Sequence, residues 1–367
     1  MQLTLSDFHY HLPPKLIAQE PIRPRDSARL MLINRQTGEI SHHHVFDLPH
    51  LIPQSSHLIA NNTKVFPARL IGHKPTGGKV EILLIQPLGQ SRYKCIARPS
   101  LKVGDVIEMR TVLTGTITHS TGYERTIKFD TEESRLRTLI SQIGAMPTPP
   151  YIKKLLGNSL DYQTIYAKYG FSAAAPTAGL HFTPDLLRSI KTQSKWHELT
   201  LNVGLGTFLP VKENDIANHH MHNESYTISP HLASAINKQR SDLCLSKLLA
   251  IGTTTMRALE SNVTLSPSSE PCDSECSQLL QPTLRPGSYS TNIFIYPPYK
   301  FQVVDALMTN FHLPGSTLLM LVSAFCSAPN SSEKFTNFKD SLLGRAYALA
   351  ISHKYRFFSF GDAMLII

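Results

Sequence analysis

The sequence has few of the features that mark secreted, membrane or metal-dependent proteins. Its 367 residues include only five cysteines, an odd and scattered set that favours reduced thiols over a disulfide framework. No basic segment followed by an apolar run opens the chain, and the most apolar run, near Thr317–Phe325, is too short to cross a bilayer. We therefore expect a soluble, cytoplasmic and monomeric protein that makes no membrane contact.

Acidic residues are also few compared with basic ones. Asp and Glu number 27 against 36 Lys and Arg, so the formal net charge is +9. An even spread of this excess would only aid solubility, whereas a cluster would attract phosphate backbones or an anionic membrane surface. Hydrophobic residues make up 41% of the chain, enough for a large core, and the length predicts two domains.

The texture of the sequence changes twice along the chain. From about Leu70 to Asp130, short β-branched runs alternate with glycine and polar turns, a pattern that predicts a small all-β module, a barrel. After Ile152, helix and strand patterns alternate. The predicted fold class is therefore α/β, with a main mixed α/β domain at 1–69 and 151–367 and an inserted barrel-like all-β domain at 70–150.

Several elements of the main domain are predicted individually. A Ser-, Pro- and Cys-rich stretch at 261–290 is typical of a flexible surface insertion. Thr291–Tyr296 is expected to be a strand, and Tyr355–Phe360 the final buried strand. The helices are predicted at Leu186–Lys191, Pro230–Gln239, from Gly252 through Ser261, Thr317–Cys326 and Ser341–Lys354.

One stretch, Ala173–Thr183, combines small residues, a proline and a glycine around a single imidazole, His181. Thr183 can cap the helix that follows, Pro184 suits its first position, and Asp185 favours the positive end of the helix dipole. Small side chains let a ligand approach the backbone, and helix-start N–H groups suit an anionic or polar ligand. A tight loop holding a hydrogen-bonded core histidine is the alternative.

A second helix start follows the predicted buried strand Lys247–Ile251. The Gly252–Thr255 turn can present N–H groups and hydroxyls to a carboxylate or phosphate, or it can simply cap its own helix. Two more histidine loops, His219–Glu224 and Asn310–Pro314, also lie at strand ends or helix starts, where open α/β sheets place ligand sites.

The sequence predicts no metal site. His219 and His222 have the spacing of one helical face, but no matching pair of ligands is apparent. Cys272 and Cys276, inside the predicted insertion, also lack a second pair of ligands nearby. The residues alone indicate an α/β protein that binds an anionic or nucleic-acid ligand.

A series of motifs runs nearly end to end along the chain: Leu16–Ala18, Asn62–Leu70, Gly77–Glu81, Met146–Ile152, Tyr162–Ala167, Ala174–Phe182, Asn202–Phe208, His219–His222 with Glu224, Gly252–Thr254, Ile293–Pro297, Val304–Leu307, Thr309–Pro314, Ser316–Phe325 and Tyr355–Met364. In this order, the motifs resemble the S-adenosylmethionine:tRNA ribosyltransferase-isomerase family of queuosine biosynthesis. Three features depart from the family pattern: Tyr169–Phe171 replaces Glu-Pro-Gly, Pro298 replaces a glycine, and the 261–290 stretch has no counterpart.

The resemblance implies an α/β domain carrying an inserted β-barrel, and a specific reaction. The ribosyl part of the co-substrate S-adenosylmethionine would be transferred and isomerised onto 7-aminomethyl-7-deazaguanine at the wobble position of a tRNA. The product would be epoxyqueuosine, with adenine and methionine released and no metal required. Because the sulfonium acidifies the C5′ hydrogens, a neutral base such as histidine suits the first step.

The resemblance also suggests site residues. Candidate catalytic residues are His181, His222, His312 and Glu224. Candidate S-adenosylmethionine ligands are Thr177, Gly179, Gly252, Thr253, Thr254, Arg257 and Asn310. Candidate RNA contacts are Arg25, Arg29, Lys64, Arg69 and Lys153. Two other functions stay open at this point: a non-catalytic RNA-binding protein and an S-adenosylmethionine-dependent RNA methyltransferase.

Overall fold

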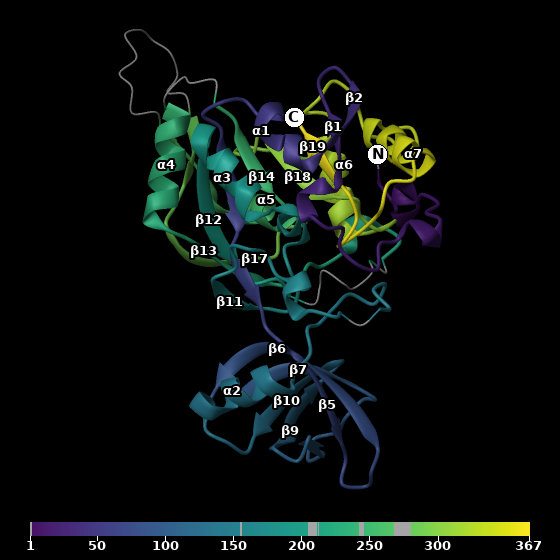
Figure 1. Ribbon diagram of the computed structural model, residues 1–367, viewed down its shortest axis with the longest axis vertical. Coiled ribbons are helices and arrows are strands. Elements are labelled where there is room, and N and C mark those ends of the chain that lie inside the picture. The colour runs from purple at the N-terminus through teal and green to yellow at the C-terminus, as the bar shows by residue number, and fades with distance from the viewer. Residues whose placement is uncertain (1, 155, 205–210, 212, 242–245, 268–279) are drawn as a thin grey trace.

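A nine-stranded mixed sheet with helices on both faces forms the larger part of the molecule, and a closed six-stranded barrel hangs from it by a narrow waist (Figure 1). The computed structural model describes residues 2–154, 156–204, 211, 213–241, 246–267 and 280–367. The α/β fold class with a barrel-like part is therefore confirmed.

The sheet has the strand order β17-β13-β12-β3-β14-β18-β19-β1-β2. Its strands are β1 (Arg29–Ile33), β2 (Ile40–His44), β3 (His57–Asn61), β12 (Lys195–Leu201), β13 (Glu224–Ile228), β14 (Leu248–Ile251), β17 (Gly287–Thr291), β18 (Ala306–Asn310) and β19 (Ala363–Ile366). The four central strands β12, β3, β14 and β18 run parallel, so their carboxyl ends meet at one edge. β3, β14 and β18 are buried along their whole length, as expected for parallel strands covered on both faces.

The α-helices cover the two faces of this sheet or connect its strands. They are α1 (Leu48–Leu51), α3 (Pro184–Gln193), α4 (Pro230–Ser241), α5 (Thr253–Asn262), α6 (Thr317–Phe325) and α7 (Leu342–Ser352). The start of α3 is as predicted: the Thr183 hydroxyl accepts a hydrogen bond from the Leu186 N–H, and Pro184 is the first helical residue. α6 is apolar all round, and its residues from Leu319 to Phe325 are buried.

The barrel closes in the strand order β10-β7-β6-β5-β8-β9. Its strands are β5 (Arg69–His73), β6 (Lys79–Gly89), β7 (Arg92–Arg98), β8 (Val106–Met109), β9 (Leu113–Thr121) and β10 (Glu124–Phe129). Alternation along β6 points Val80, Ile82 and Leu84 into the barrel core and leaves Glu81 and Leu83 on the outer face. Closure leaves no unpaired strand edge.

The description of 70–150 as all-β is incomplete, because it also contains the amphipathic helix α2 (Glu133–Ile143). Leu136 and Ile140 of α2 are buried in the barrel's hydrophobic cluster. The β-strand pattern ends near Asp130, and α2 begins three residues beyond it.

The 261–290 stretch differs from the expected flexible insertion. Its ends form strands: β15 (Val263–Pro267) pairs with β16 (Leu280–Leu284), and β17 is an edge strand of the main sheet. The Asn237 side chain of α4 hydrogen-bonds the backbone of Leu284, which is itself buried. Within the described part of this stretch, Thr264, Ser266, Thr283, Ser288 and Ser290 occupy strand positions. Residues 268–279, which include Cys272 and Cys276, lie outside the described part of the chain.

Two predicted strands were misplaced. The last strand is β19, because Ala363–Ile366 is fully buried between β18 and β1. The aromatic run Tyr355–Phe360 instead turns through the core, with Phe358 at a φ of 69°. Likewise, the strand expected at Thr291–Tyr296 ends at Thr291, where its hydroxyl accepts the Ile293 N–H and turns the chain. Buried aromatic residues in a short run do not by themselves distinguish a strand from a packed loop.

Candidate ligand pocket

A pocket opens at the carboxyl ends of the parallel strands. It holds about 720 Å³ of empty space, including the space open to solvent at its mouth. Three segments that follow strands or lead into helices supply most of its wall, as expected for an open α/β sheet. The wall residues are Tyr151, Tyr162, Ala174, Ala175, Pro176, Thr177, Ala178, Val203, Gly252, Thr253, Thr254, Thr309, Asn310, Phe311, His312, Leu313, Ser316, Leu318, Phe358 and Ser359.

The start of α5 lies in this wall. Gly252 has a φ of 90°, a conformation that favours glycine, and its N–H donates to the Met308 carbonyl at 2.8 Å. Thr253 and Thr254 follow in the first turn of the helix, where N–H groups lack partners within the helix. The positive end of the helix dipole therefore faces the pocket, an arrangement that favours a ligand carboxylate.

His312 is the one candidate histidine that lines the pocket. Its Nε2 is 2.9 Å from the Thr309 hydroxyl, and its backbone N–H donates to the Tyr347 hydroxyl. The Tyr10 hydroxyl donates to the His312 carbonyl, so three hydrogen bonds fix this residue. Burial lowers the pKa of His312 to about 3, and the imidazole is therefore neutral at physiological pH.

His181 lies behind the wall, not in it. Its Nε2 is 3.1 Å from Asn310 Nδ2, and the Asn310 Oδ1 accepts a hydrogen bond from the Thr177 hydroxyl at 2.9 Å. Because the amide nitrogen donates, His181 Nε2 is the acceptor and its proton is on Nδ1, which faces the Arg25 carbonyl. Burial lowers the pKa of His181 to about 4. The residue thus orients two side chains that do line the pocket.

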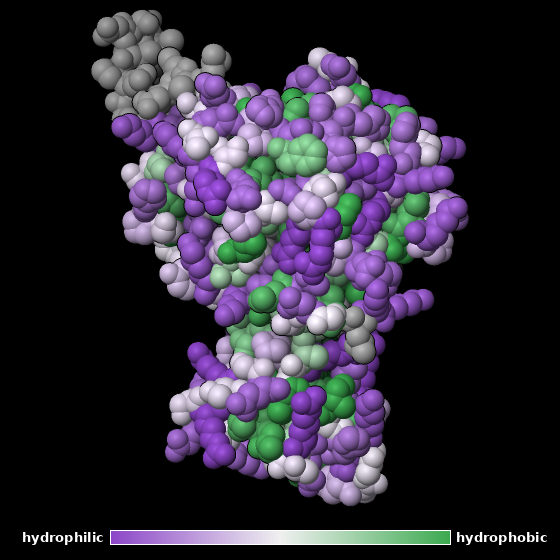
Figure 2. Space-filling view, viewed as in Figure 1, coloured by the Kyte–Doolittle hydropathy of each residue, from purple (hydrophilic) through white to green (hydrophobic). Residues whose placement is uncertain are grey.

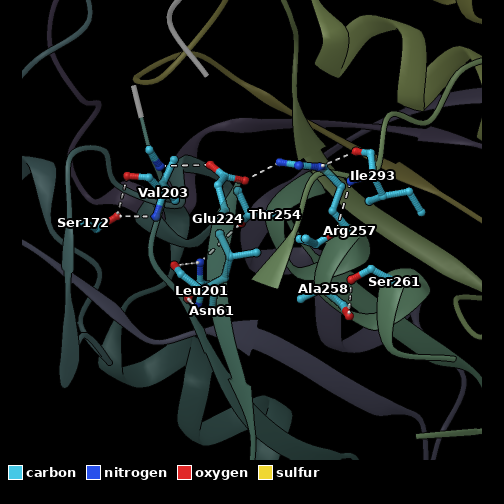
Figure 3. Close-up of polar contacts among 12 residues, drawn as sticks. Asn61, Ser172, Leu201, Val203, Glu224, Thr254, Arg257, Ala258, Ser261 and Ile293 are labelled. Carbon is cyan, nitrogen blue, oxygen red and sulfur yellow. Dashed lines mark hydrogen bonds and ion pairs between the residues drawn. The ribbon is translucent and has the colours of Figure 1, made fainter. Parts of the chain in front are cut away.

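Glu224 and Arg257 form a buried ion pair beside the pocket (Figure 3). One Glu224 oxygen contacts Arg257 Nη1, and the other accepts the Gly204 N–H at 2.9 Å. Arg257 Nε donates to the Ile293 carbonyl, and its Nη2 has no hydrogen-bond partner within the described residues. Neither residue lines the pocket; the pair fixes the chain next to Val203, which does.

Two further candidates lie away from the pocket. His222 is exposed, is not on a helix, and contacts the Tyr123 hydroxyl of the barrel at 3.3 Å. Gly179 packs against Tyr166, whose hydroxyl oxygen would lie 2.0 Å from a Cβ placed there, so only glycine fits. Of the eleven residues predicted for catalysis and S-adenosylmethionine binding, the pocket wall therefore brings together Thr177, Gly252, Thr253, Thr254, Asn310 and His312.

The predicted RNA contacts divide into engaged and available side chains. Arg25 donates to the carbonyls of Leu160 and Gln163, and Arg29 pairs with Asp362, so both brace the fold. Arg69 forms an ion pair with Glu81 at 2.9 Å. The exposed side chains are those of Lys64 and Lys153.

The wall also contains residues that were not singled out as site candidates. Tyr151, Tyr162 and Phe358 supply aromatic surface, and the Tyr151 hydroxyl is 2.8 Å from Ser359 Oγ. The sequence motifs Met146–Ile152 and Tyr355–Met364 could have indicated Tyr151 and Phe358. Both motifs place aromatic residues near prolines or glycines, which is typical of loops, and aromatic residues in loops can line a ligand site.

Positive charge is concentrated on the barrel. The segment from Arg69 to Phe129 has ten Lys and Arg against four Asp and Glu, so it carries +6 of the chain's net +9. The described residues that line the pocket, in contrast, include no Lys, Arg, Asp or Glu. Across the described residues, no helix is both long and apolar enough to cross a membrane.

Fold and site define a two-part α/β protein with an uncharged small-molecule pocket and a basic barrel beside it. A family model described as queuosine biosynthesis protein matches residues 5–366. The chain therefore belongs to the queuosine biosynthesis protein family, and it is an enzyme of the transferase class.

Similar proteins cover the whole chain. A protein of Symbiobacterium thermophilum named S-adenosylmethionine:tRNA ribosyltransferase-isomerase is 44% identical over 100% of both chains. One of Caldanaerobacter subterraneus with the same name is 44% identical over 99% of both. The crystal structure of S-adenosylmethionine tRNA ribosyltransferase from Thermotoga maritima is 33% identical, covers 99% of this chain and 100% of its own, and gives a TM-score of 0.52.

Proposed function

We propose that this enzyme transfers and isomerises the ribosyl group of S-adenosylmethionine onto 7-aminomethyl-7-deazaguanine at the wobble position of tRNA. The product is epoxyqueuosine-tRNA, and adenine and methionine leave. The relatives' names support the ribosyltransferase-isomerase class.

The observation that carries the proposal is the composition of the pocket wall. A sulfonium is a cation, and no described wall residue is a lysine or arginine that would repel it. Tyr151, Tyr162 and Phe358 offer aromatic faces, which attract cations. The methionine carboxylate of the same ligand finds the positive end of α5 at Gly252–Thr254. An uncharged, aromatic pocket with one anion-binding end matches a zwitterionic sulfonium ligand.

His312 is the proposed proton acceptor. With Nε2–H donating to the Thr309 hydroxyl oxygen, the lone pair is on Nδ1, which has no hydrogen-bond partner in the described structure. This nitrogen takes the C5′ proton whose acidity the adjacent sulfonium raises, giving an ylide. Because the ring is neutral it can accept this proton, and the imidazolium formed can return the proton at a later step.

Two of the other three candidates, His181 and Glu224, become positioning residues. His181 holds the Asn310 amide in one orientation, so that Asn310 and Thr177 present a fixed pair of polar atoms to the ligand. Glu224 has both carboxylate oxygens engaged, so it holds the Gly204 backbone and does not act as a free base. Cations on the barrel then attract the tRNA, the proposed macromolecular substrate.

Product analysis tests the reaction. Purified enzyme is incubated with S-adenosylmethionine and a tRNA carrying 7-aminomethyl-7-deazaguanine, and the small molecules are separated. The proposal predicts methionine and free adenine in equal amounts, each matching the modified tRNA formed. S-adenosylhomocysteine would instead indicate a methyltransferase, and unchanged S-adenosylmethionine with bound RNA would indicate a binding protein.

A further inference from the structure

A second hollow lies between the barrel and the segment that returns from it to the main sheet. It is open, with about 1000 Å³ of empty space, and is here called the barrel groove. Strands β5, β6 and β7 supply one wall through outward-facing side chains, and the extended proline-rich return segment supplies the other. The lining residues are Arg69, Glu81, Leu83, Ile96, Arg98, Pro147, Thr148, Pro149, Pro150 and Ile152.

Strand register fixes the pattern of this groove. Leu83 of β6 pairs with Ile96 of β7, so the two side chains form one apolar strip. Arg69 is opposite Leu83 on the other side, and Arg98 is opposite Glu81. The result is an apolar floor with an arginine at each end. Figure 2 shows apolar surface on the barrel and at the waist, bordered by hydrophilic side chains.

The charges of the groove favour an anion. Arg69 is neutralised by its ion pair with Glu81, whereas exposed Arg98 has no ion-pair or hydrogen-bond partner within the described residues. Lys153, also exposed, directly follows Ile152 of the groove wall. The groove sits on the barrel that carries most of the chain's net positive charge. The groove therefore attracts a ligand that carries phosphate groups, whereas an acidic or neutral surface would not attract it.

The wall chemistry favours a nucleobase over a peptide strand. Pro147, Pro149 and Pro150 have no N–H group, so this wall cannot donate the regular hydrogen bonds that an added β-strand needs. Leu83, Ile96 and the proline rings instead present flat apolar surfaces. Such surfaces bury a planar ring in a way that tolerates any base.

The groove and the ligand pocket border the same short stretch of chain. Tyr151 lines the pocket, while its chain neighbours Pro150 and Ile152 line the groove. Consecutive Cα atoms are only about 3.8 Å apart, so one short stretch of chain separates the two hollows. An RNA strand with one nucleotide at the pocket can therefore place the neighbouring nucleotide at the groove.

We propose that the barrel groove is a subsite for the nucleotide next to the reactive one in a single-stranded RNA loop. Its base packs on Leu83 and Ile96 against the proline wall, and its phosphate pairs with Arg98. The inference rests on the proposed function, because it takes the reactive nucleotide to enter the pocket.

Charge reversal at one end of the groove tests the phosphate contact. The probe is a fluorescent anticodon stem-loop RNA, titrated at several salt concentrations. Arg98→Glu is expected to weaken binding about tenfold near 0.1 M salt, the loss of one charge-assisted contact. It should also reduce the slope of log affinity against log salt by roughly 0.7–0.9. S-adenosylmethionine affinity is expected to stay unchanged.

Lys128→Glu is the matched control. Lys128 is exposed on the same barrel but pairs with Arg92, at the opposite end of β7 from the groove. It changes the net charge equally, and its affinity for the RNA should stay within about twofold of wild type. Equal losses in the two variants, or no loss in Arg98→Glu, would overturn the groove assignment.

Crosslinking tests the base contact. Ile96→p-benzoylphenylalanine is irradiated with the stem-loop, and the crosslinked nucleotide is mapped. A single crosslink next to the wobble nucleotide is expected; crosslinks in the stem, or to protein alone, would refute the subsite. The two proposals fail separately, because a wild-type enzyme that releases adenine and methionine supports the reaction even where Arg98→Glu behaves like the control.

Discussion

The ligand pocket and the barrel groove differ in charge, in burial and in the way they are built. The pocket joins segments far apart in the sequence at the end of parallel strands, and its described wall has no charged side chain. The groove is made of neighbouring strands and one return segment, and it has exposed Arg98 at its rim. Buried interactions are little screened by salt, whereas exposed ones are screened strongly. The two regions therefore suit different tasks, bond breaking and polyanion binding.

The largest effect is expected at His312. Removal of a general base lowers turnover by ~10²–10⁴-fold. His312→Gln should do so with S-adenosylmethionine affinity retained, and thermal melting of the variant checks that it folds. Thr309→Val, which removes the hydroxyl that orients Nε2, is expected to lose less. A His312→Gln enzyme with at least a tenth of wild-type turnover would exclude this histidine as the base.

The next effect concerns stability around the pocket. Glu224→Ala leaves Arg257 as a buried, unpaired charge, which costs about 3–5 kcal/mol of unfolding free energy. Arg188→Ala is the control, because Arg188 is 73% exposed in its ion pair with Asp185 and contributes about 0.5 kcal/mol or less. Urea unfolding measures both. Similar losses of unfolding free energy in the two variants would mean that the buried ion pair contributes no more to stability than the exposed one.

The histidines of the pocket region predict a pH dependence. The pKa of His181 is lowered to about 4, while the unfolded chain protonates histidine near 6.5, so the unfolded state binds more protons between these values. Unfolding free energy should therefore be highest above pH 6.5 and fall as pH drops toward 4, by on the order of 3 kcal/mol from this residue.

His181→Gln separates this contribution from that of other groups. The variant should be less stable at pH 7 by about 1–3 kcal/mol, since the Arg25 carbonyl or the Asn310 amide loses its partner. Its loss of stability between pH 6.5 and 4 should be shallower than that of wild type. Urea unfolding at several pH values provides the comparison, and parallel curves would contradict the assignment.

The smallest effect per contact is the salt dependence of RNA binding. Each phosphate neutralised contributes a slope of roughly 0.7–0.9, which is less than about twofold in affinity between 0.1 and 0.2 M salt. Affinity for S-adenosylmethionine should change less than affinity for the stem-loop, because the pocket is buried and uncharged. Equal salt responses of the two ligands would remove the distinction between pocket and groove.

Most of the architecture could be predicted from local patterns. The alternation in 70–130 predicts the barrel strands because one face of each is buried, and the Thr183–Asp185 cap predicts the start of α3. The prediction of a strand at Tyr355–Phe360 was wrong because a packed aromatic loop is as apolar as a buried strand. The strands at the ends of 261–290 were not predicted, because an edge strand such as β17 is polar and half-exposed and its sequence is similar to that of a loop.

The site was less predictable than the fold. His181 and His312 both occur in conspicuous motifs, but only tertiary packing places one in the pocket wall and the other behind Asn310. His222 meets Tyr123, about a hundred residues earlier in the chain, a contact that no local pattern indicates. Counting charges along the sequence already places most of the net charge between Arg69 and Phe129, whereas the groove that Arg69 and Arg98 border needs the strand register.

Steady-state kinetics of two variants tests the division of labour most directly. Adenine release is followed while the tRNA concentration is varied for wild type, His312→Gln and Arg98→Glu. We expect His312→Gln to lower kcat by ~10²–10⁴-fold with the KM for tRNA nearly unchanged. Arg98→Glu should raise that KM about tenfold and leave kcat close to wild type. If both variants changed the same parameter, pocket and groove would not have separate roles.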